Sequence, residues 1–389
     1  MLRILGAAGT SLVLVAAAAA PAQAATSWTV LSTSDRGTVA NELYGSAALS
    51  ASSAWAVGSW YDTGRAAPRT LIERWNGTSW STVTSPNATD YYNELRDVDA
   101  ASASSAWAVG YANGSPGVNG APRNALALRW NGTSWSAVAT PQPGTNFRQL
   151  YGVKAVSATD AWAVGWYYDS SLHGEALMLH WNGTAWTQVT APDPGTSGTS
   201  LEGVAGTAAN DIWAVGYYSN TGEKGVLAHP LAVHYNGVSW VRSPLPESGT
   251  GTFLHSVTAL SATDVWAVGS KNGYATPVAY HWNGSVWSEV PTAPVGGAGN
   301  NILYGVSGTA SGVWAVGYSS AGGRTQPMVQ RWSGTAFTNE TVPRQEIGGL
   351  LYSVAATAGP TVFAAGTRWD LNDSGSISDR TLSMRGSGS

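Results

Sequence analysis

The sequence predicts an all-β fold: a seven-bladed β-propeller with four antiparallel strands per blade and a ring closed by the N-terminal strand. The first observation is a repeat, because Trp-Ala-Val-Gly recurs every 48 to 55 residues, starting at Trp55, Trp107, Trp162, Trp213, Trp266 and Trp314, with a divergent VFAAG copy at residue 362. The second is that each copy holds four strand-like segments, which in the third copy are LYGVKAVS, DAWAVGWYY, ALMLHWNG and TAWTQVT. A period near fifty with four short strands is typical of propeller blades.

The alternation of side chains along a strand explains why this tetrapeptide is repeated. In Trp-Ala-Val-Gly, Trp and Val share one face while Ala and Gly share the other, so each blade offers a bulky face to one neighbour and a small face to the next. Asn-Gly follows Trp75, Trp130, Trp181 and Trp282. This dipeptide predicts a type I′ hairpin turn between the third and fourth strands.

The third observation concerns the chain ends. The seventh copy stops after its third strand, RTLSMRG, and lacks a fourth strand with its Trp. The segment TSWTVLS at residues 26–32 resembles TSWSTVTS at residues 78–85, the fourth strand of the first copy. We therefore expect the N-terminal strand to complete the last blade, which removes the sheet edges of an open chain.

The domain boundaries follow. Arg3, the apolar run 4–20 and the small residues around Ala22-Gln23-Ala24 are typical of a secretory signal peptide covering residues 1–24. The propeller is expected over residues 25–384, and residues 385–389 are expected to form a flexible tail. The mature protein is predicted to be secreted and extracellular, with no membrane span.

Composition excludes several classes of function. The chain has 389 residues, a net charge of -4 and no Lys/Arg-rich run, so nothing predicts binding to nucleic acid. The absence of cysteine excludes thiol catalysis and zinc–thiolate sites. The sequence contains no G-x-S-x-G, H-E-x-x-H or P-loop motif. A binding module is therefore favoured over an enzyme, although a carboxylate pair such as Glu202 with Asp97 or Glu94 would suffice for glycoside hydrolysis.

Tryptophans outside the repeat pattern point to a ligand surface. Seventeen of the 20 occupy repeated strand positions, and the remainder are Trp60, Trp166 and Trp369, all just after the second strand of a repeat. The loops after this strand and those between repeats should share one face, and they are the long, variable ones. Aromatic side chains there suit carbohydrate or protein contact. The predicted ligand-binding residues are Trp60, Tyr61, Tyr111, Trp166, Tyr167, Tyr217, Tyr318 and Trp369.

The innermost strand supplies a second candidate site. The residue after its first Leu differs in charge and shape between copies, and these positions should surround one mouth of the central channel. The alternative is that they only fill the channel, as propeller channels require. The predicted channel-mouth residues are Tyr44, Arg96, Tyr151, Glu202, His255, Tyr304 and Tyr352.

One loop resembles a calcium site. The segment DLNDSGSISD at residues 370–379 places oxygen ligands at alternate positions around a Gly. Asp370, Asn372, Ser374 and Asp379 are the predicted ligands, although Thr381 stands where a bidentate acid is expected. A solvated polar loop would look the same.

The repeated D-x-WAVG … HWNGTSW unit resembles a group of secreted actinobacterial propellers. Within that group it is similar to the lectin-like propeller subunits of the umbrella toxin particles of Streptomyces. The resemblance implies a target-recognition subunit of an extracellular antibacterial complex that binds a cell-surface glycan, an adaptor protein, or both. The alternative is an extracellular polysaccharide hydrolase or lyase with its site at the channel mouth. The sequence does not choose between the outer loops and the channel mouth.

Overall fold

The computed structural model describes residues 26–64, 67–114, 122–222, 228–247, 251–296, 299–372 and 375–387. The predicted signal peptide therefore lies outside the described residues. Almost all regular structure is strand. The described residues contain one short 3-10 helix, η1 (Ala321–Gly323), and no helix among them is long and apolar enough to cross a membrane.

The strands follow one another in repeated sets of four. Their bounds are β2 (Ala40–Ser50), β3 (Ser53–Tyr61), β4 (Arg69–Trp75), β5 (Trp80–Thr82); β6 (Tyr92–Ser102), β7 (Ser105–Asn113), β8 (Arg123–Trp130), β9 (Trp135–Val138); β10 (Arg148–Ala155), β11 (Ala161–Tyr168), β12 (Gly174–Trp181), β13 (Trp186–Gln188); β14 (Gly198–Ala208), β15 (Asp211–Ser219), β16 (His229–Tyr235), β17 (Trp240–Arg242). They continue with β18 (Phe253–Ser261), β19 (Asp264–Lys271), β20 (Thr276–Trp282), β21 (Trp287–Val290); β22 (Asn301–Thr309), β23 (Gly312–Ser319), β24 (Gln326–Trp332), β25 (Phe337–Asn339); β26 (Gly348–Ala356), β27 (Thr361–Leu371) and β28 (Ile377–Ser387).

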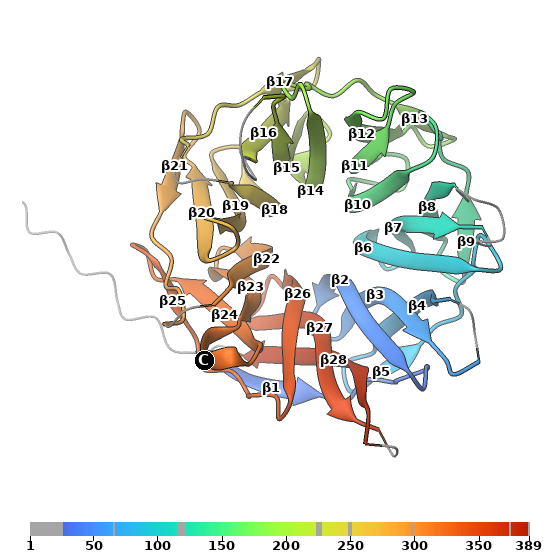
Figure 1. Cartoon of the computed structure of the whole chain (residues 1–389), viewed down its shortest axis with the longest axis vertical. Helices are drawn as coiled ribbons and strands as arrows, with labels where there is room; N and C mark the ends of the chain where they lie inside the picture. Colours follow the sequence, from blue (N-terminus) through green and yellow to red (C-terminus); the bar gives the residue numbers. More distant parts are fainter. Residues whose placement is uncertain are drawn as a thin grey trace, which may run out of the picture.

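These strands form antiparallel sheets around a central axis, with the first strand of each set innermost (Figure 1). Five sheets have four strands each. The sixth has eight, because the sets β10–β13 and β14–β17 are joined by a single parallel bridge between Gly174 and Gly198. The fold is a β-propeller, as its repeated strands predicted.

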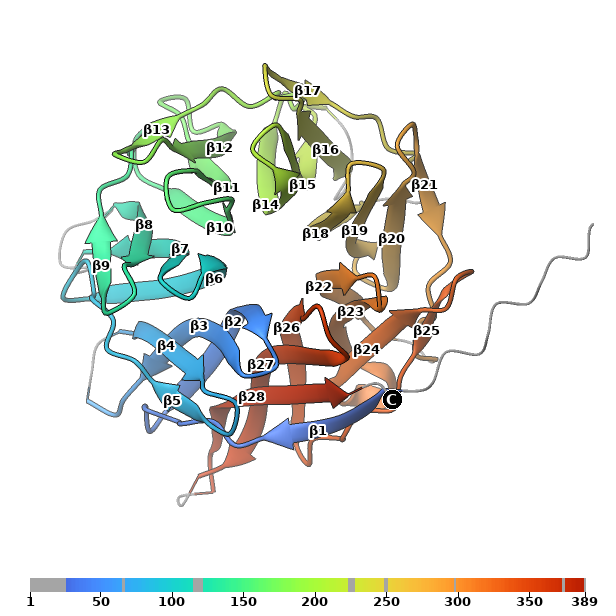
Figure 2. The same cartoon turned by 180° about the vertical axis from the view of Figure 1, so that it is seen from behind.

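The two ends of the chain meet in one sheet. Strand β1 (Ser27–Leu31) runs antiparallel to β28, pairing Leu31 with Ser383 and Ser27 with Ser387, and the sheet order is β1-β28-β27-β26. Figure 2 shows β1 on the outer side of β28. The expected tail from residue 385 is therefore wrong: β28 continues to Ser387, because β1 provides backbone partners for Arg385 and Gly386 as well.

Packing between sheets follows the alternation in Trp-Ala-Val-Gly. Trp55 and Val57 of β3 share one core cluster with the small residues Ala106 and Ala108 of β7. Burying such apolar surface contributes roughly 25 cal/mol per Å², so each interface between neighbouring sheets is a substantial source of stability. The bulky face of one sheet thus meets the small face of the next.

The turns after the third strand of each set differ from the prediction. Trp75 pairs with Trp80, so the connection spans residues 76–79 rather than two residues. Asn76 Oδ1 accepts hydrogen bonds from the backbone N–H groups of Thr78 and Ser79 at 2.9 Å. Gly77 has a positive φ of 104°, whereas Asn76 does not have a positive φ. The asparagine side chain closes the turn and removes the need for a type I′ geometry.

The long loops share one face, as expected. Residues 33–39, which precede β2, contact the loop after β3 through a hydrogen bond from Val39 N to Tyr61 O at 3.0 Å. Thr38 N donates to Asp62 Oδ1 in the same place, also at 3.0 Å. Equivalent backbone bonds join Thr145 to Tyr168 and Ser197 to Ser219. We call this face the loop face.

Candidate functional site at the channel mouth

A cavity of about 360 Å³ runs down the centre of the propeller. Its walls come from the innermost strands β2, β6, β10, β14, β18, β22 and β26. All of the predicted channel-mouth residues line it: Tyr44, Arg96, Tyr151, Glu202, His255, Tyr304 and Tyr352. We call this set the mouth ring; a cavity of this size matches small-ligand sites in other proteins.

Each mouth-ring residue occupies a β-bulge. In β2 the pairing register shifts between Leu43 and Gly45, which leaves Tyr44 without a partner in β3. The same shift skips Arg96 in β6 and Tyr151 in β10. It also skips the mouth-ring residues of the other innermost strands. Bulges re-aim a side chain and increase the local twist, and here they direct one side chain per innermost strand into the cavity.

The glycine of Trp-Ala-Val-Gly lies opposite this bulge. Gly58 pairs with Leu43, and a Cβ atom at Gly58 would lie 1.9 Å from the carbonyl oxygen of Glu42. A Cβ at Gly165 would lie 1.8 Å from Gln149 O, and the corresponding glycines Gly110, Gly216, Gly269, Gly317 and Gly366 have equally close carbonyl contacts. Only glycine fits, since any side chain would collide with the bulged strand.

Tyrosine rings form a continuous arc on one side of the mouth. The ring centroids of Tyr44 and Tyr352 are 4.9 Å apart, and those of Tyr352 and Tyr304 are 5.4 Å apart. His255 continues the arc at 5.2 Å from Tyr304. The guanidinium of Arg96 lies over the Tyr44 ring, 4.4 Å from its centroid. These separations are typical of aromatic and cation–π contacts.

Arg96 is held by a buried carboxylate from its own strand. Arg96 Nε lies 2.6 Å from Glu94 Oε1, and Glu94 also accepts hydrogen bonds from the hydroxyls of Tyr92 at 2.7 Å and Tyr111 at 3.1 Å. Tyr92 and Tyr111 stack on each other, with centroids 5.6 Å apart. The Glu94–Arg96 pair is thus fixed by both charge and hydrogen bonding.

Glu202 and His255 lie in the same mouth on neighbouring strands, but with fewer partners. Glu202 accepts a hydrogen bond from Ser200 Oγ at 3.0 Å, and burial raises its pKa to about 7. His255 Nε2 is buried without a hydrogen-bond partner among the described residues, and burial lowers the pKa of this histidine to about 4. At neutral pH the histidine is therefore neutral, and Glu202 is in the range where it gains or loses a proton.

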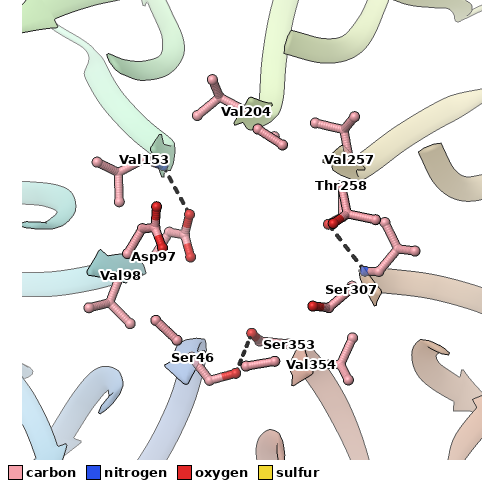
Figure 3. A pocket seen from close by; sticks show the side chains of 18 of the residues that line it. Ser46, Asp97, Val98, Val153, Val204, Val257, Thr258, Ser307, Ser353 and Val354 are labelled. Atoms are coloured by element: carbon pink, nitrogen blue, oxygen red, sulfur yellow. Dashed lines mark hydrogen bonds between the residues drawn. The ribbon is translucent and has the colours of Figure 1, made fainter. Parts of the chain in front are cut away.

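Deeper in the cavity, side chains link one innermost strand to the next. Asp97 Oδ2 accepts a hydrogen bond from Val153 N at 2.9 Å (Figure 3). Asp99 Oδ2 accepts one from Ala155 N, also at 2.9 Å. Asp99 also pairs with Lys154 at 2.9 Å. Serines do the same elsewhere, as in the bond from Val306 N to Ser256 Oγ at 3.2 Å. These contacts satisfy backbone N–H groups that an innermost strand, as a sheet edge, leaves unpaired.

The predicted aromatic residues of the loop face divide into two groups. Trp60 and Tyr111 are buried, with 7% and 3% exposed surface, so they differ from the expectation of free rings on the surface. Trp60 belongs to a core cluster that includes Leu43 and Phe363. The half-buried members of the predicted set are Tyr61, Trp166, Tyr167, Tyr217, Tyr318 and Trp369.

Several half-buried aromatics support the mouth rather than a separate outer pocket. Trp166 Nε1 donates to Tyr151 Oη at 3.1 Å. Tyr318 lies 6.0 Å from Tyr304 between ring centroids. Tyr217 packs on Phe253, on which Tyr274 also stacks. The mouth and the loop residues just outside it thus form one continuous site.

The predicted calcium ligands belong to the β27–β28 hairpin. Asp370 pairs with Arg368 at 3.2 Å, and Asn372 Oδ1 accepts a hydrogen bond from Ser376 N at 2.9 Å. Asp379 pairs across the hairpin with Trp369, while Ser374 lies outside the described residues. Across the described part of the chain, no group of three or more His, Cys, Asp or Glu side chains is placed to hold a metal ion.

Some mouth residues were missed by sequence reasoning. Glu42, whose carboxylate accepts a hydrogen bond from Tyr44 Oη at 2.5 Å, lies two residues before the mouth-ring position, as Glu94 lies before Arg96. Acids at the same offset in two repeats are a signal that the sequence contained. Tyr274, in the loop after β19, gave no signal because its place beside Phe253 depends on the folded chain.

No family model and no curated protein matches this sequence. Solved structures do match in fold. One is YCF48 bound to D1 peptide, with TM-score 0.53, 12% identity and coverage of 93% of this chain and 97% of that one. Another is YCF48 from Cyanidioschyzon merolae, with TM-score 0.50, 15% identity and coverage of 92% and 98%. A third is a PL25 ulvan lyase bound to -[GlcA(1-4)Rha3S]-, with TM-score 0.51, 11% identity and coverage of 92% and 94%. YCF48 and the lyase are β-propellers, and the likeness concerns the fold.

Proposed function

We propose that this protein is a secreted, lectin-like binding module that recognises its target through the loop face, with the channel mouth at the centre of the site. In this proposal the propeller has seven blades and is closed by β1. The module serves as the target-recognition subunit of an extracellular antibacterial toxin complex, and its partners are a cell-surface glycan, an adaptor protein, or both.

One observation carries the proposal. Every innermost strand directs one side chain into a single cavity through the same bulge, which a glycine makes possible. A position that only filled the channel could be occupied by one residue type in all repeats. Instead it holds tyrosine four times together with Arg96, Glu202 and His255. A rigid scaffold that presents varied side chains at one place is how binding sites are built.

The test is retention of ligands by immobilised protein. A glycan array and secreted culture medium are each applied to the wild type, Trp166→Ala and Glu202→Arg. We expect the wild type to retain a ligand and both substitutions to weaken its retention, because Trp166 supports Tyr151 and Glu202 lies in the mouth. If neither substitution changes any retained ligand, the site is not on this face.

The enzyme alternative is supported by a specific pair of groups. Glu202, whose pKa burial raises to about 7, is able to donate or accept a proton near neutral pH, and the neutral His255 in the same cavity is able to accept a hydrogen bond through a ring nitrogen. This arrangement favours an extracellular polysaccharide hydrolase or lyase with its site at the mouth. Incubation with a panel of cell-wall and extracellular polysaccharides tests it. Oligosaccharide released by the wild type but not by Glu202→Gln or His255→Ala would establish catalysis over binding alone.

A further inference from the structure

We propose that the channel mouth takes up a cationic side chain, the ammonium of a lysine or the guanidinium of an arginine, from a protruding segment of a protein partner. The inference rests on the proposed binding function and specifies the chemistry of what is bound. It is carried by the balance of charge in the mouth, by its tyrosine rings and by the depth of the cavity.

The charges at the mouth are unbalanced. Three carboxylates, Glu42, Glu94 and Glu202, accompany one guanidinium, Arg96, which is already bound to Glu94 at 2.6 Å. The cation deeper in the cavity, Lys154, is bound to Asp99. Among the described residues Glu202 has no ion pair, and Ser200 Oγ is its hydrogen-bond partner. Arg96 faces Glu202 without forming an ion pair with it, and a buried carboxylate without a direct ion pair is costly, so an incoming cation would reduce that cost.

The tyrosine arc already holds a cation. Arg96 lies 4.4 Å from the Tyr44 centroid, so the face of a mouth-ring tyrosine accommodates a guanidinium here. Tyr352, Tyr304 and Tyr151 extend the same aromatic lining around the mouth. Aromatic faces combined with a carboxylate select ammonium and guanidinium groups over neutral or anionic ones.

A second unpartnered group points to the same ligand chemistry. His255 Nε2 is buried in the cavity wall without a hydrogen-bond partner among the described residues. Because burial keeps this histidine neutral, one ring nitrogen is an acceptor, which suits an N–H donor of the ligand. The neutral His255 offers no positive charge to an anionic ligand, and the carboxylate of Glu202 would repel such a ligand.

The depth of the cavity accommodates an extended side chain. Its lining extends along β2 from Tyr44 to Ala48, which corresponds to roughly 13 Å of strand. At the deep end the lining combines small residues, including Ala48, Gly308 and Ala356, with the ion pair of Asp99 and Lys154. An extended lysine or arginine side chain fits within this depth without burying the hydroxyl groups that a sugar would bring. The platform that a glycan would need on the outer loops is reduced, since Trp60 and Tyr111 are buried.

The experiment compares matched peptides by calorimetric titration of the mature full chain. The probe is acetyl-Gly-Gly-Arg-Gly-Gly-amide, and its citrulline analogue has nearly the same shape without the charge. We expect the arginine peptide to bind about tenfold more tightly than the citrulline peptide at pH 8. Glu202→Gln should abolish the difference. Glu247→Gln removes the same charge from a side chain that is 57% exposed and outside the cavity lining, so it should preserve the difference.

The pH dependence gives an independent reading. The titratable groups facing Glu202 are Arg96, His255, Tyr151, Tyr217, Tyr274 and Tyr304. His255 stays neutral above its pKa of about 4, and burial raises the pKa of each of these tyrosines above 10. Affinity for the arginine peptide should therefore rise between pH 6 and pH 8, as Glu202 ionises, and Glu202→Gln should flatten the profile.

A parallel titration with a glucosamine tetramer and its N-acetylated form distinguishes an amino sugar from a protein side chain as the source of the cation. Preference for the glucosamine tetramer over the arginine peptide would overturn the protein partner. Equal binding of the arginine and citrulline peptides, or no effect of Glu202→Gln, would overturn the cationic ligand. In that case a neutral or anionic ligand still lost in Trp166→Ala would leave the proposed binding function standing.

Discussion

Asp97 shows how one channel-facing side chain balances two demands. Its carboxylate accepts the otherwise unpaired N–H of Val153 on the neighbouring sheet, yet the same position is buried. Burial raises the pKa of Asp97 from 3.8 to about 7, because desolvation outweighs the hydrogen bonds that stabilise the charge. The folded protein therefore binds this proton more tightly than the unfolded chain does.

We predict that the substitution Asp97→Asn becomes relatively more favourable as the pH rises. The stabilising contribution of the protonated carboxyl is fully present below about pH 4 and is lost as the pH rises toward 7. Asparagine keeps an acceptor for Val153 N without the charge. The melting temperature of the variant relative to the wild type should increase by at least about 2 °C between pH 4 and pH 8. Asp90→Asn, at an exposed site, is the control, and the same pH trend in both variants would contradict the assignment.

At the scale of elements, the repeated tetrapeptide acquires a role beyond packing. Its glycine gives room for the bulge on the innermost strand, and the bulge aims the mouth-ring residue into the cavity. In every repeat, the position of the variable mouth-ring side chain therefore depends on the glycine opposite the bulge.

We predict that Gly165→Ala destabilises the protein by about 3 kcal/mol, because the new methyl group would overlap the carbonyl of Gln149. The displaced bulge should also weaken the hydrogen bond between Trp166 and Tyr151 and thereby alter the fluorescence of Trp166. Urea unfolding measures the first effect. Gly114→Ala, where the added Cβ meets no atom within 4 Å, should change stability by less than about 0.5 kcal/mol. Equal effects of the two substitutions would refute this role for the bulge.

The β27–β28 hairpin carries the calcium prediction. We expect calcium to bind through Asp370, Asn372 and Ser374, with Asp379 beside them, and to order the residues near Trp369. Binding requires Asp370 to exchange Arg368 for the ion, and Asn372 Oδ1 to exchange its bond with Ser376 N. Calorimetry should give heat on calcium addition to the wild type and none with Asp370→Ala. A magnesium titration is the control, and absence of heat in the wild type ends the prediction.

At the scale of the whole molecule, the N-terminal strand joins the two ends of the chain. Trp28 is buried, and its Nε1 donates to Glu340 at 2.6 Å, so β1 is anchored to the neighbouring sheet as well as to β28. Without β1, the outer edge of β28 would be exposed along its length.

We predict that a chain beginning at residue 33 has a markedly lower melting temperature than one beginning at residue 25, or fails to fold. The physical reason is the loss of the β1–β28 ladder and the burial of Trp28. Circular dichroism with thermal unfolding makes the comparison, and aggregation of the shorter chain is measured by light scattering. Unchanged melting would show that β1 does not close the propeller.

The innermost strands illustrate how far sequence reasoning reached. The position after the first Leu was identified from its variation among otherwise similar repeats, and the structure places all of those side chains in one cavity. The bulge that aims them was not predicted, because a one-residue register shift leaves the pattern of apolar residues almost unchanged. Likewise, Trp60 and Tyr111 follow the repeat motif in the manner of Trp166, but the folded chain buries the first two: Trp60 packs in a cluster with Phe363 of a neighbouring sheet, and Tyr111 stacks on Tyr92 of its own sheet.

What the sequence by itself determined is therefore the repeat, its strand order, the strand that the N-terminus contributes and the mouth-ring positions. These features depend on local periodicity, which can be read directly from the sequence. Only the tertiary structure decided which aromatics remain accessible, that Arg96 is already bound to Glu94, and that Glu202 and His255 are left with few partners. Burial and charge pairing depend on which side chains from distant repeats meet around the axis, and no local pattern encodes those distances.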